Sequence, residues 1–167
     1  MIRIAITGPE SCGKSTLATA LSKHYYADHI EEYARQYITE RDGVYERVDM
    51  DEMARTHYKN IILSQNSIQI IDTDFIVFKV WFEHKYKATS QQINEFVDEE
   101  LFDLHILCTP DIPWEEDPIR ENPEDREYLF AQFEQLLQQR ERNYIIVNGT
   151  HKNRVEKSIQ AIGALLN

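Results

Sequence analysis

The sequence predicts one α/β domain, residues 1–167, in which a five-stranded parallel sheet is flanked by helices on both faces. Five short apolar runs alternate with longer segments whose apolar residues recur at helical spacing, the pattern of successive strand–helix units. The runs are nearly continuous in apolar residues, which is typical of parallel strands buried on both faces. A length of 167 residues suits one compact domain, and the sequence contains no repeat, low-complexity tract or interdomain linker.

The boundaries of the elements follow from where the apolar spacing changes. Strands are expected near residues 2–6, 27–31, 67–72, 104–108 and 144–147. The first helix is expected to follow a glycine-rich loop at residues 8–15, and the third to begin at Asp49 as its N-cap. The others are expected over residues 32–38, from 75, over 90–101, from 129 to 142 and from 155 to 166.

The most informative stretch runs from Gly8 to Ser15, with the spacing G-x-x-x-x-G-K-S of a phosphate-binding P-loop. It lies between an expected strand and an expected helix, which is the context that the motif requires. Gly8 and Gly13 allow backbone conformations and a close approach that a side chain would prevent. Lys14 supplies positive charge for the β- and γ-phosphates, and Ser15 a hydroxyl ligand for Mg²⁺. We therefore predict that a nucleoside triphosphate binds to Gly8, Glu10, Ser11, Cys12, Gly13, Lys14 and Ser15.

The overall charge excludes one class of partner. A net charge of −11 and a pI near 5.0 argue against nonspecific binding of nucleic acid, which needs a basic face. No run of about 18 apolar residues occurs, so no membrane span is expected. Because the first strand begins at the N-terminus, we expect no signal peptide, and Cys12 and Cys108 should be free thiols in a reducing cytoplasm.

Two acidic residues follow the expected third strand. Asp72 ends that strand, where an acid can hold Mg²⁺ beside a P-loop; the alternative is an acid that merely ends a strand or caps the next helix. Asp74 is equally placed to cap that helix or to bind substrate.

The expected second strand leads into Glu31 and Glu32, at the edge where ligands bind in open α/β sheets. One of them is a candidate to orient or deprotonate an acceptor hydroxyl, and the alternative is a solvated acid in the first turn of a helix. Arg35, one turn later, could bind phosphate or pair with a nearby carboxylate.

The segment around residues 110–126 is expected to form a lid. Trp114 lies in its polar, proline-stiffened part and is either a packing residue or an aromatic plate for a flat ring. Arg120 and Arg126 could stabilise charge on a transferring phosphoryl group, or pair with the neighbouring acids. After the fifth strand, Gly149 and Thr150 could contact an adenine edge or form an ordinary turn.

Five segments together resemble the ribosylnicotinamide kinase domain of NadR-type NAD-salvage proteins, and they keep its motif order over nearly the whole chain. They are GPESCGKSTL, EEYARQYI, IIDTDF, DLHILCTPDIPWEEDPIR followed by a later arginine, and V-N-G-T-H-x-x-R. The resemblance implies a P-loop kinase fold and transfer of the ATP γ-phosphate to the 5′-hydroxyl of nicotinamide riboside. It places Gly13, Lys14, Ser15 and Thr16 on ATP and Mg²⁺, and Asp72 on the metal side. Near the nucleoside it places Glu32, Tyr33, Arg35, Asp74, Trp114 and Asp117, with Trp114 stacked on the cationic nicotinamide ring.

The chain departs from the family pattern in two respects. The family often carries D-D-G-x-R in the lid, where this chain has Glu116-Asp117-Pro118-Ile119-Arg120, and proline should stiffen that turn. The H-x-G-H motif of the adenylyltransferase domain in larger NadR-type proteins does not occur, so we expect neither that activity nor DNA binding.

The hypothesis from sequence is therefore a cytoplasmic, ATP- and Mg²⁺-dependent kinase of a small nucleoside, with nicotinamide riboside as the first candidate. Lys14, Arg120 and Arg126 would stabilise charge, and Glu32 would orient the acceptor hydroxyl, with Asp74 as second choice. The alternatives are a kinase of another nucleoside or nucleoside monophosphate, and a nucleotide-dependent ATPase switch. The sequence predicts no nucleic-acid or membrane partner and does not determine an oligomeric state.

Overall fold

The computed structural model describes residues 1–118, 120–121 and 123–166. Ile119 and Asn122, which belong to the expected lid, and Asn167 lie outside this part of the chain. Within it the elements are β1 (Ile2–Thr7), α1 (Lys14–Tyr25), β2 (Asp28–Ile30), α2 (Tyr33–Thr39), α3 (Arg47–Leu63), β3 (Ile68–Asp72), α4 (Phe75–Tyr86), α5 (Gln91–Asp98), β4 (Leu104–Cys108), α6 (Arg126–Gln139), β5 (Tyr144–Val147) and α7 (His151–Leu166).

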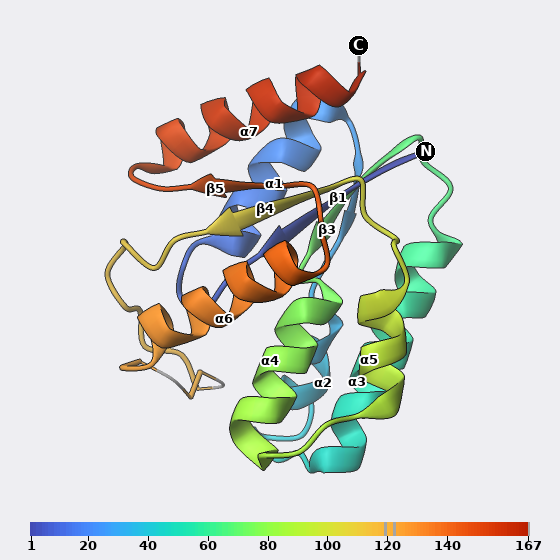
Figure 1. Ribbon diagram of the computed structural model, residues 1–167, viewed down its shortest axis with the longest axis vertical. Helices are drawn as coiled ribbons and strands as arrows, with labels where there is room; N and C mark the ends of the chain where they lie inside the picture. The colour runs from blue at the N-terminus through green and yellow to red at the C-terminus, as the bar shows by residue number, and fades with distance from the viewer. Residues whose placement is uncertain (119, 122, 167) are drawn as a thin grey trace.

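The five strands form one all-parallel sheet in the order β2-β3-β1-β4-β5. The central strand β1 pairs with β3 on one side and with β4 on the other, so that Ile4 lies opposite both Ile70 and Leu104. Helices α1 and α7 cover one face, and the remaining helices lie on the other (Figure 1). The predicted fold class, a parallel five-stranded sheet flanked on both faces, is confirmed.

Each face of the sheet has its own apolar core, because successive side chains of a strand point to opposite faces. On β3, Ile70 packs with the cluster under α1 and α7, whereas Ile71 belongs to the larger cluster under α4. Both side chains are fully buried. This two-sided burial explains why the strands read as continuous apolar runs in the sequence.

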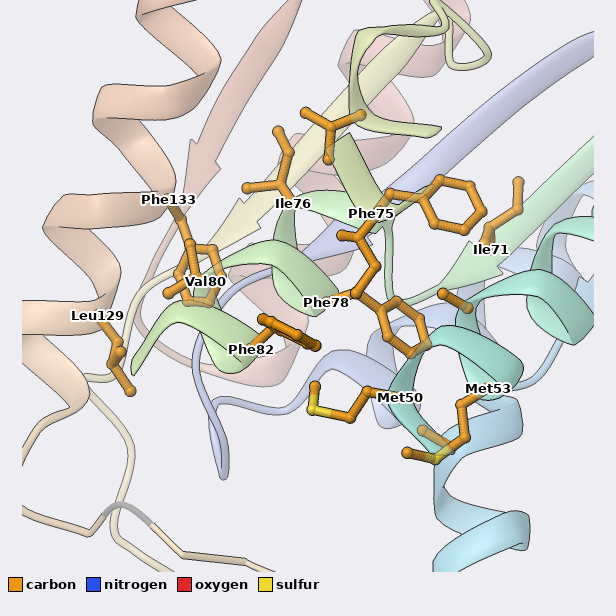
Figure 2. Packing of buried hydrophobic residues seen from close by; sticks show 14 of the residues in the cluster. Met50, Met53, Ile71, Phe75, Ile76, Phe78, Val80, Phe82, Leu129 and Phe133 are labelled. Atoms are coloured by element: carbon orange, nitrogen blue, oxygen red, sulfur yellow. The ribbon is translucent and has the colours of Figure 1, made fainter. Parts of the chain in front are cut away.

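The larger core is built around the aromatic side chains of α4. Phe75, Phe78 and Phe82 are each 1% exposed and lie between the methionines of α3 and the apolar face of α6 (Figure 2). Because α4 contacts the cluster on more than one side, its sequence is apolar around most of its circumference. This core fixes α4 and α6 against the sheet.

Several expected helix boundaries are wrong: α5 ends at Asp98 rather than residue 101, α6 begins at Arg126 rather than residue 129, and α7 begins at His151 rather than residue 155. The third helix begins at Arg47 with Glu46 as N-cap, and Asp49 lies three residues later in a capping box, where its carboxylate accepts the Glu46 N–H at 2.7 Å. The sixth helix ends at Gln139 rather than residue 142, because Glu141 adopts a positive φ of 51° that an α-helix excludes. No helix in the described ranges is long and apolar enough to cross a membrane.

Candidate active site

The glycine-rich loop connects β1 to α1 at the carboxyl end of the sheet. Gly8 has φ +135°, and a Cβ on it would lie 2.7 Å from the Cys108 carbonyl oxygen, so no other residue fits there without displacing backbone. Gly13 has φ +83° and directly precedes the first residue of α1. The loop thus aims the α1 N-terminus, with its unpaired N–H groups and positive dipole end, into the site.

Lys14 lies at the mouth of this loop. Its ammonium Nζ donates hydrogen bonds to the carbonyl oxygens of Gly8 at 2.9 Å and Pro9 at 2.7 Å. Burial lowers the pKa of Lys14, but the negative charges of the neighbouring groups, Glu32 and Asp72 among them, outweigh burial and raise it above its ordinary value. Lys14 is therefore a permanent cation beside the loop.

Glu32 is the acidic residue that faces Lys14. It occupies the N-cap position of α2 without using its side chain as a cap, and its carboxyl group lines the cavity next to the P-loop. Burial raises the pKa of Glu32, with Asp72 adding to the shift and Lys14 opposing it. A half-buried carboxyl group with a raised pKa, placed in a cavity, has the properties of a general base. Glu31, by contrast, is exposed.

Asp72 ends β3 beside the P-loop and is 3% exposed. Its Oδ1 atom is buried and has no hydrogen-bond partner among the described residues. A buried carboxylate oxygen without a partner is costly unless an ion or a water molecule satisfies it, so the position fits a Mg²⁺ ion or one of its water ligands. In the described part of the chain, no group of three or more histidine, cysteine or acidic side chains is arranged to hold a metal ion.

Asp74 has a structural role. It is fully buried; its Oδ1 accepts hydrogen bonds from the Val77 N–H at 3.0 Å and the Thr7 hydroxyl at 3.1 Å. Its Oδ2 accepts the Nδ1–H of His105 at 2.8 Å. Because both oxygens are engaged within the fold, the geometry favours the helix-cap alternative, and the expectation that Asp74 binds substrate or orients the acceptor is not supported.

A cavity with a volume of about 190 Å³ joins the P-loop to an apolar chamber. One wall is the P-loop itself, from Gly8 to Thr16. The other walls come from α2, α4, the lid and α6, through Glu32, Ala34, Arg35, Ile38, Val77, Val80, Trp81, His84, Ile112, Glu115, Arg120, Leu129 and Phe133. The cavity therefore has a polar, phosphate-binding end and an apolar end suited to a ring.

Sequence reasoning missed the α4 wall of this cavity. Val77, Val80, Trp81 and His84 follow the spacing i, i+3, i+4, i+7 and so form one stripe on α4. The stripe lies beside the Phe75, Phe78 and Phe82 stripe that faces the core, and the sequence does not distinguish the two. The sequence did contain one indication of this wall: α4 is apolar on more of its sides than packing against a single core requires.

Four of the residues expected near the nucleoside are not part of the cavity wall: Tyr33, Asp74, Trp114 and Asp117. Tyr33 packs against the larger core and the ring of Tyr37. Asp117 forms an ion pair with Arg35 at 2.8 Å, so it anchors the lid to α2. For Arg35 the pairing alternative is thus observed, although its side chain also lines the cavity.

Trp114 lies against the two lid arginines. The guanidinium carbons of Arg120 and Arg126 are 5.9 and 5.7 Å from the centroid of its ring. This arrangement favours the packing alternative for Trp114, because the indole holds both cations in place. Stacking of Trp114 on a substrate ring stays a prediction.

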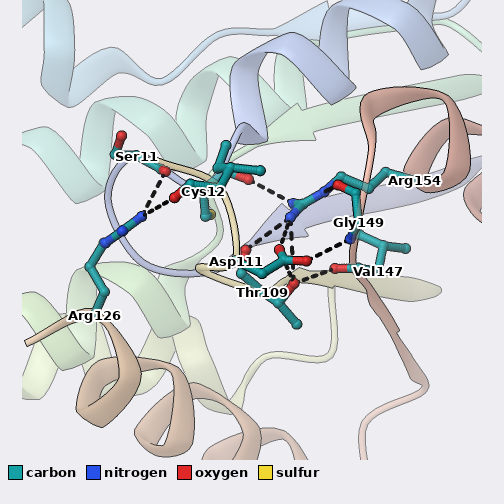
Figure 3. A network of polar contacts seen from close by, with 9 residues as sticks. Ser11, Cys12, Thr109, Asp111, Arg126, Val147, Gly149 and Arg154 are labelled. Atoms are coloured by element: carbon teal, nitrogen blue, oxygen red, sulfur yellow. Dashed lines mark hydrogen bonds and ion pairs between the residues drawn. The ribbon is translucent and has the colours of Figure 1, made fainter. Parts of the chain in front are cut away.

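The lid arginines contact the P-loop directly. Arg120 donates to the Ser11 hydroxyl at 3.3 Å and to the Glu115 carbonyl oxygen at 2.5 Å. Arg126, the first residue of α6, donates to the carbonyl oxygens of Ser11 at 3.1 Å and Ile112 at 3.0 Å (Figure 3). The lid thus brings positive charge to the phosphate end of the cavity.

The turn after β5 is occupied by contacts of its own. Gly149 has φ +74°, and its N–H donates to the Asp111 carboxylate at 2.6 Å. The Thr150 hydroxyl accepts the Asn153 N–H at 3.3 Å at the start of α7. These contacts favour the alternative of an ordinary strand-to-helix turn for Gly149 and Thr150, and contact with adenine is not supported.

Comparison with known proteins places this site in a family. A family described as an AAA domain matches residues 3–154. The chain belongs to this family. The chain is also similar to the trifunctional NAD biosynthesis/regulator protein NadR of Salmonella typhimurium, with 34% identity over 125 residues. Its identity to the same protein of Escherichia coli is 33% over 125 residues. The alignments cover 70% of this chain and 30% of each relative. The resemblance to NadR indicated by the motifs is confirmed.

Solved structures with the same fold include NadR in complex with NR, with a TM-score of 0.76 at 21% identity. That match covers 98% of this chain and 51% of the NadR chain. A deoxyadenosine kinase from M. mycoides with bound dATP has a TM-score of 0.66 at 16% identity, with 98% of this chain and 100% of that chain covered. The fold is therefore that of P-loop kinases.

Proposed function

We propose that the protein is an ATP-dependent kinase that transfers the γ-phosphate to the 5′-hydroxyl of nicotinamide riboside and forms nicotinamide mononucleotide. The observation that carries the proposal is the continuous cavity, in which Glu32 stands between the P-loop and an apolar chamber. The similarity to NadR supports nicotinamide riboside as the acceptor. Assignment of residues 1–167 to one domain, a cytoplasmic location, and the absence of nucleic-acid and membrane partners remain predictions.

The phosphate end of the cavity would hold ATP. Backbone N–H groups between Gly8 and Thr16 would bind the phosphates, and Lys14 would exchange its contacts with the loop carbonyls for contacts with the β- and γ-phosphates. Ser15 and Asp72 would hold Mg²⁺, which when bound neutralises charge on the phosphates. Arg120 and Arg126 would add positive charge from the lid.

The apolar end would hold the nucleoside. Glu32 would accept the proton of the 5′-hydroxyl, and its pKa, which burial raises, would make it a stronger base than a solvated glutamate. The nicotinamide ring carries a positive charge, and Trp81 on the α4 wall offers an aromatic surface to such a ring. Glu32 and Glu115 add negative charge to the same cavity. Because Arg35 and Arg120 line this cavity too, the preference for a cationic ring over a neutral base would rest mainly on the Trp81 face.

A second candidate is a kinase of another nucleoside, which the structural similarity to deoxyadenosine kinase over its whole length supports. An ATPase switch is less well supported, because a switch requires no second chamber for a small molecule.

The test is product analysis. The protein is incubated with Mg·ATP and nicotinamide riboside, and the products are identified by mass and by ³¹P NMR. The proposal requires equimolar ADP and a 5′-monoester of the riboside, with formation lost in Lys14→Met. ATP hydrolysis at the same rate with and without the riboside, and no phosphoester, would contradict it.

A further inference from the structure

Arg154 is a buried cation that the proposed reaction does not use. It lies in the first turn of α7, and its side chain is 4% exposed. Its guanidinium donates hydrogen bonds to the carbonyl oxygens of Cys12 at 2.8 Å, Gly149 at 3.0 Å and Thr109 at 3.1 Å, and forms an ion pair with Asp111 (Figure 3). A buried arginine satisfied mainly by backbone carbonyls holds those carbonyls in place.

The partners of Arg154 come from three segments that are far apart in the sequence. Cys12 belongs to the P-loop, Thr109 and Asp111 begin the segment that leads into the lid, and Gly149 forms the turn between β5 and α7. Asp111 closes the network, because its second oxygen accepts the Gly149 N–H at 2.6 Å. Figure 3 shows the guanidinium at the centre of the three segments.

The contact with Cys12 has a consequence for phosphate binding. The Cys12 carbonyl and the Gly13 N–H belong to one planar trans peptide unit and point in opposite directions. A hydrogen bond that fixes the carbonyl toward Arg154 therefore fixes the Gly13 N–H away from Arg154, which lies outside the cavity wall that Gly13 lines. Because Gly13 has no side chain and a positive φ, this peptide would otherwise rotate with little resistance.

We propose that Arg154 is a positioning residue for nucleotide binding: it orients the Cys12–Gly13 peptide so that the Gly13 N–H faces the phosphates. The hydrogen bonds to Thr109 and Gly149 and the ion pair with Asp111 hold the guanidinium in a fixed position relative to the start of the lid segment. Arg154 acts through the backbone and is not part of the cavity wall. The inference rests on the proposed function only in so far as the P-loop binds a nucleotide.

Arg142 provides a matched control. Its guanidinium also donates to backbone carbonyls, Val97 at 2.9 Å and Asp98 at 3.2 Å, and pairs with Glu100 at 3.1 Å. Its side chain is 10% exposed. These partners lie at the end of α5 and just beyond it, and neither they nor Arg142 line the cavity. A substitution at Arg142 therefore shows how the loss of a comparable buried arginine, remote from the cavity, affects nucleotide affinity.

The experiment compares Arg154→Lys with Arg142→Lys. Lysine keeps the charge but lacks the planar fork, so it cannot hold several carbonyls at once. We expect R154K to raise the Kd for Mg·ADP, measured by calorimetry, and the KM for ATP by about tenfold, the effect of one lost charged hydrogen bond, with the acceptor KM unchanged. R142K should leave nucleotide affinity at the wild-type value, whatever it does to the Tm.

Equal effects of the two substitutions on Mg·ADP affinity, or no effect of R154K, would overturn the inference. If R154K does not fold, Asp111→Asn removes the ion pair and retains an oxygen for the Gly149 N–H. The inference then requires weaker Mg·ADP binding in D111N, and wild-type affinity overturns it. Because Mg·ADP binding needs no acceptor, the result decides the role of Arg154 even if nicotinamide riboside is not phosphorylated.

Discussion

Glu31 and Glu32 are adjacent in the chain but have different surroundings. Glu31 is exposed, whereas the Glu32 carboxyl group faces Lys14 and Asp72 at the P-loop end of the cavity. Burial and the nearby negative charge of Asp72 raise the pKa of Glu32, which makes the carboxylate a stronger base than a solvated glutamate. The proposed chemistry of the site therefore assigns different roles to two identical side chains.

Glu32→Gln should lower kcat by about 100-fold or more, the usual contribution of a general base, with the KM for ATP little changed. Glu31→Gln is the control and should keep wild-type kcat. In the wild type, kcat should fall as the pH falls through the raised pKa of Glu32, that is, above the ordinary glutamate pKa of 4.5. A wild-type kcat for E32Q would remove Glu32 from the mechanism.

The same pKa shift makes a prediction about stability. A carboxyl group whose pKa rises on folding favours the folded state below its unfolded pKa, and this contribution is lost as the pH rises through the folded pKa. Above the folded pKa the ionised Glu32 is therefore a cost to folding, and E32Q should melt there at the same or a higher temperature than the wild type. A lower Tm for E32Q in that pH range, measured by scanning calorimetry, would mean that Glu32 supports the fold.

Asp74→Ala should lower stability and leave acceptor binding intact, the reverse of the effects expected for E32Q. The substitution removes the cap of α4 and leaves the buried Thr7 hydroxyl and His105 Nδ1 without their partner. We expect a loss of about 2–4 kcal/mol in the free energy of unfolding, from the lost cap and the unsatisfied groups. The acceptor KM of the folded fraction should stay near the wild-type value. A large rise in acceptor KM without loss of stability would restore Asp74 as a substrate ligand.

At the scale of elements, the lid is held to α4 through Tyr45. The Tyr45 hydroxyl accepts the indole N–H of Trp81 at 3.1 Å and a hydrogen bond from Lys85 at 2.6 Å. It donates to the Glu121 carboxylate of the lid at 3.0 Å. One hydroxyl thus connects an aromatic side chain of the cavity wall to the segment that covers the cavity.

Tyr45→Phe should raise the acceptor KM several-fold, up to about tenfold, because it leaves Trp81 without its partner and weakens the lid contact. The KM for ATP should not change. The control is Tyr58→Phe, which removes a hydroxyl bonded to Glu99, outside the cavity wall. Equal acceptor KM values for Y45F, Y58F and the wild type would show that the Tyr45 contacts do not serve substrate binding.

The features that could be predicted are those specified by residues close together in the sequence. The P-loop is a contiguous motif whose loop, glycines and helix start are specified within eight residues, so Gly8, Gly13 and Lys14 lie where predicted. Trp114 and Trp81 show the limit. Trp81 is flanked by apolar residues and Trp114 by a proline and a glutamate, and only tertiary packing determines that Trp81 lines the cavity while Trp114 lies against the lid arginines. The motif V-N-G-T-H-x-x-R ends at Arg154, but the contacts of this arginine could not be predicted, since its partners are up to 142 residues away.

At the scale of the whole molecule, the strand order brings the functional groups together. With β1 between β3 and β4, the P-loop after β1 lies next to Asp72 at the end of β3 and to Cys108 at the end of β4. Helices α2 and α4 then form one wall of the cavity, and the segment after β4 forms the lid. Ligands of open α/β sheets bind at this carboxyl edge, where a change of strand order opens a crevice.

We propose that this one cavity selects a cationic nucleoside for phosphorylation. The most direct measurement is kcat/KM with saturating Mg·ATP for nicotinamide riboside, uridine, cytidine and deoxyadenosine, with ADP release and product mass recorded together. We expect the value for nicotinamide riboside to exceed each of the others by at least about tenfold, which corresponds to about 1.4 kcal/mol of added transition-state stabilisation. A higher value for any neutral nucleoside would contradict it.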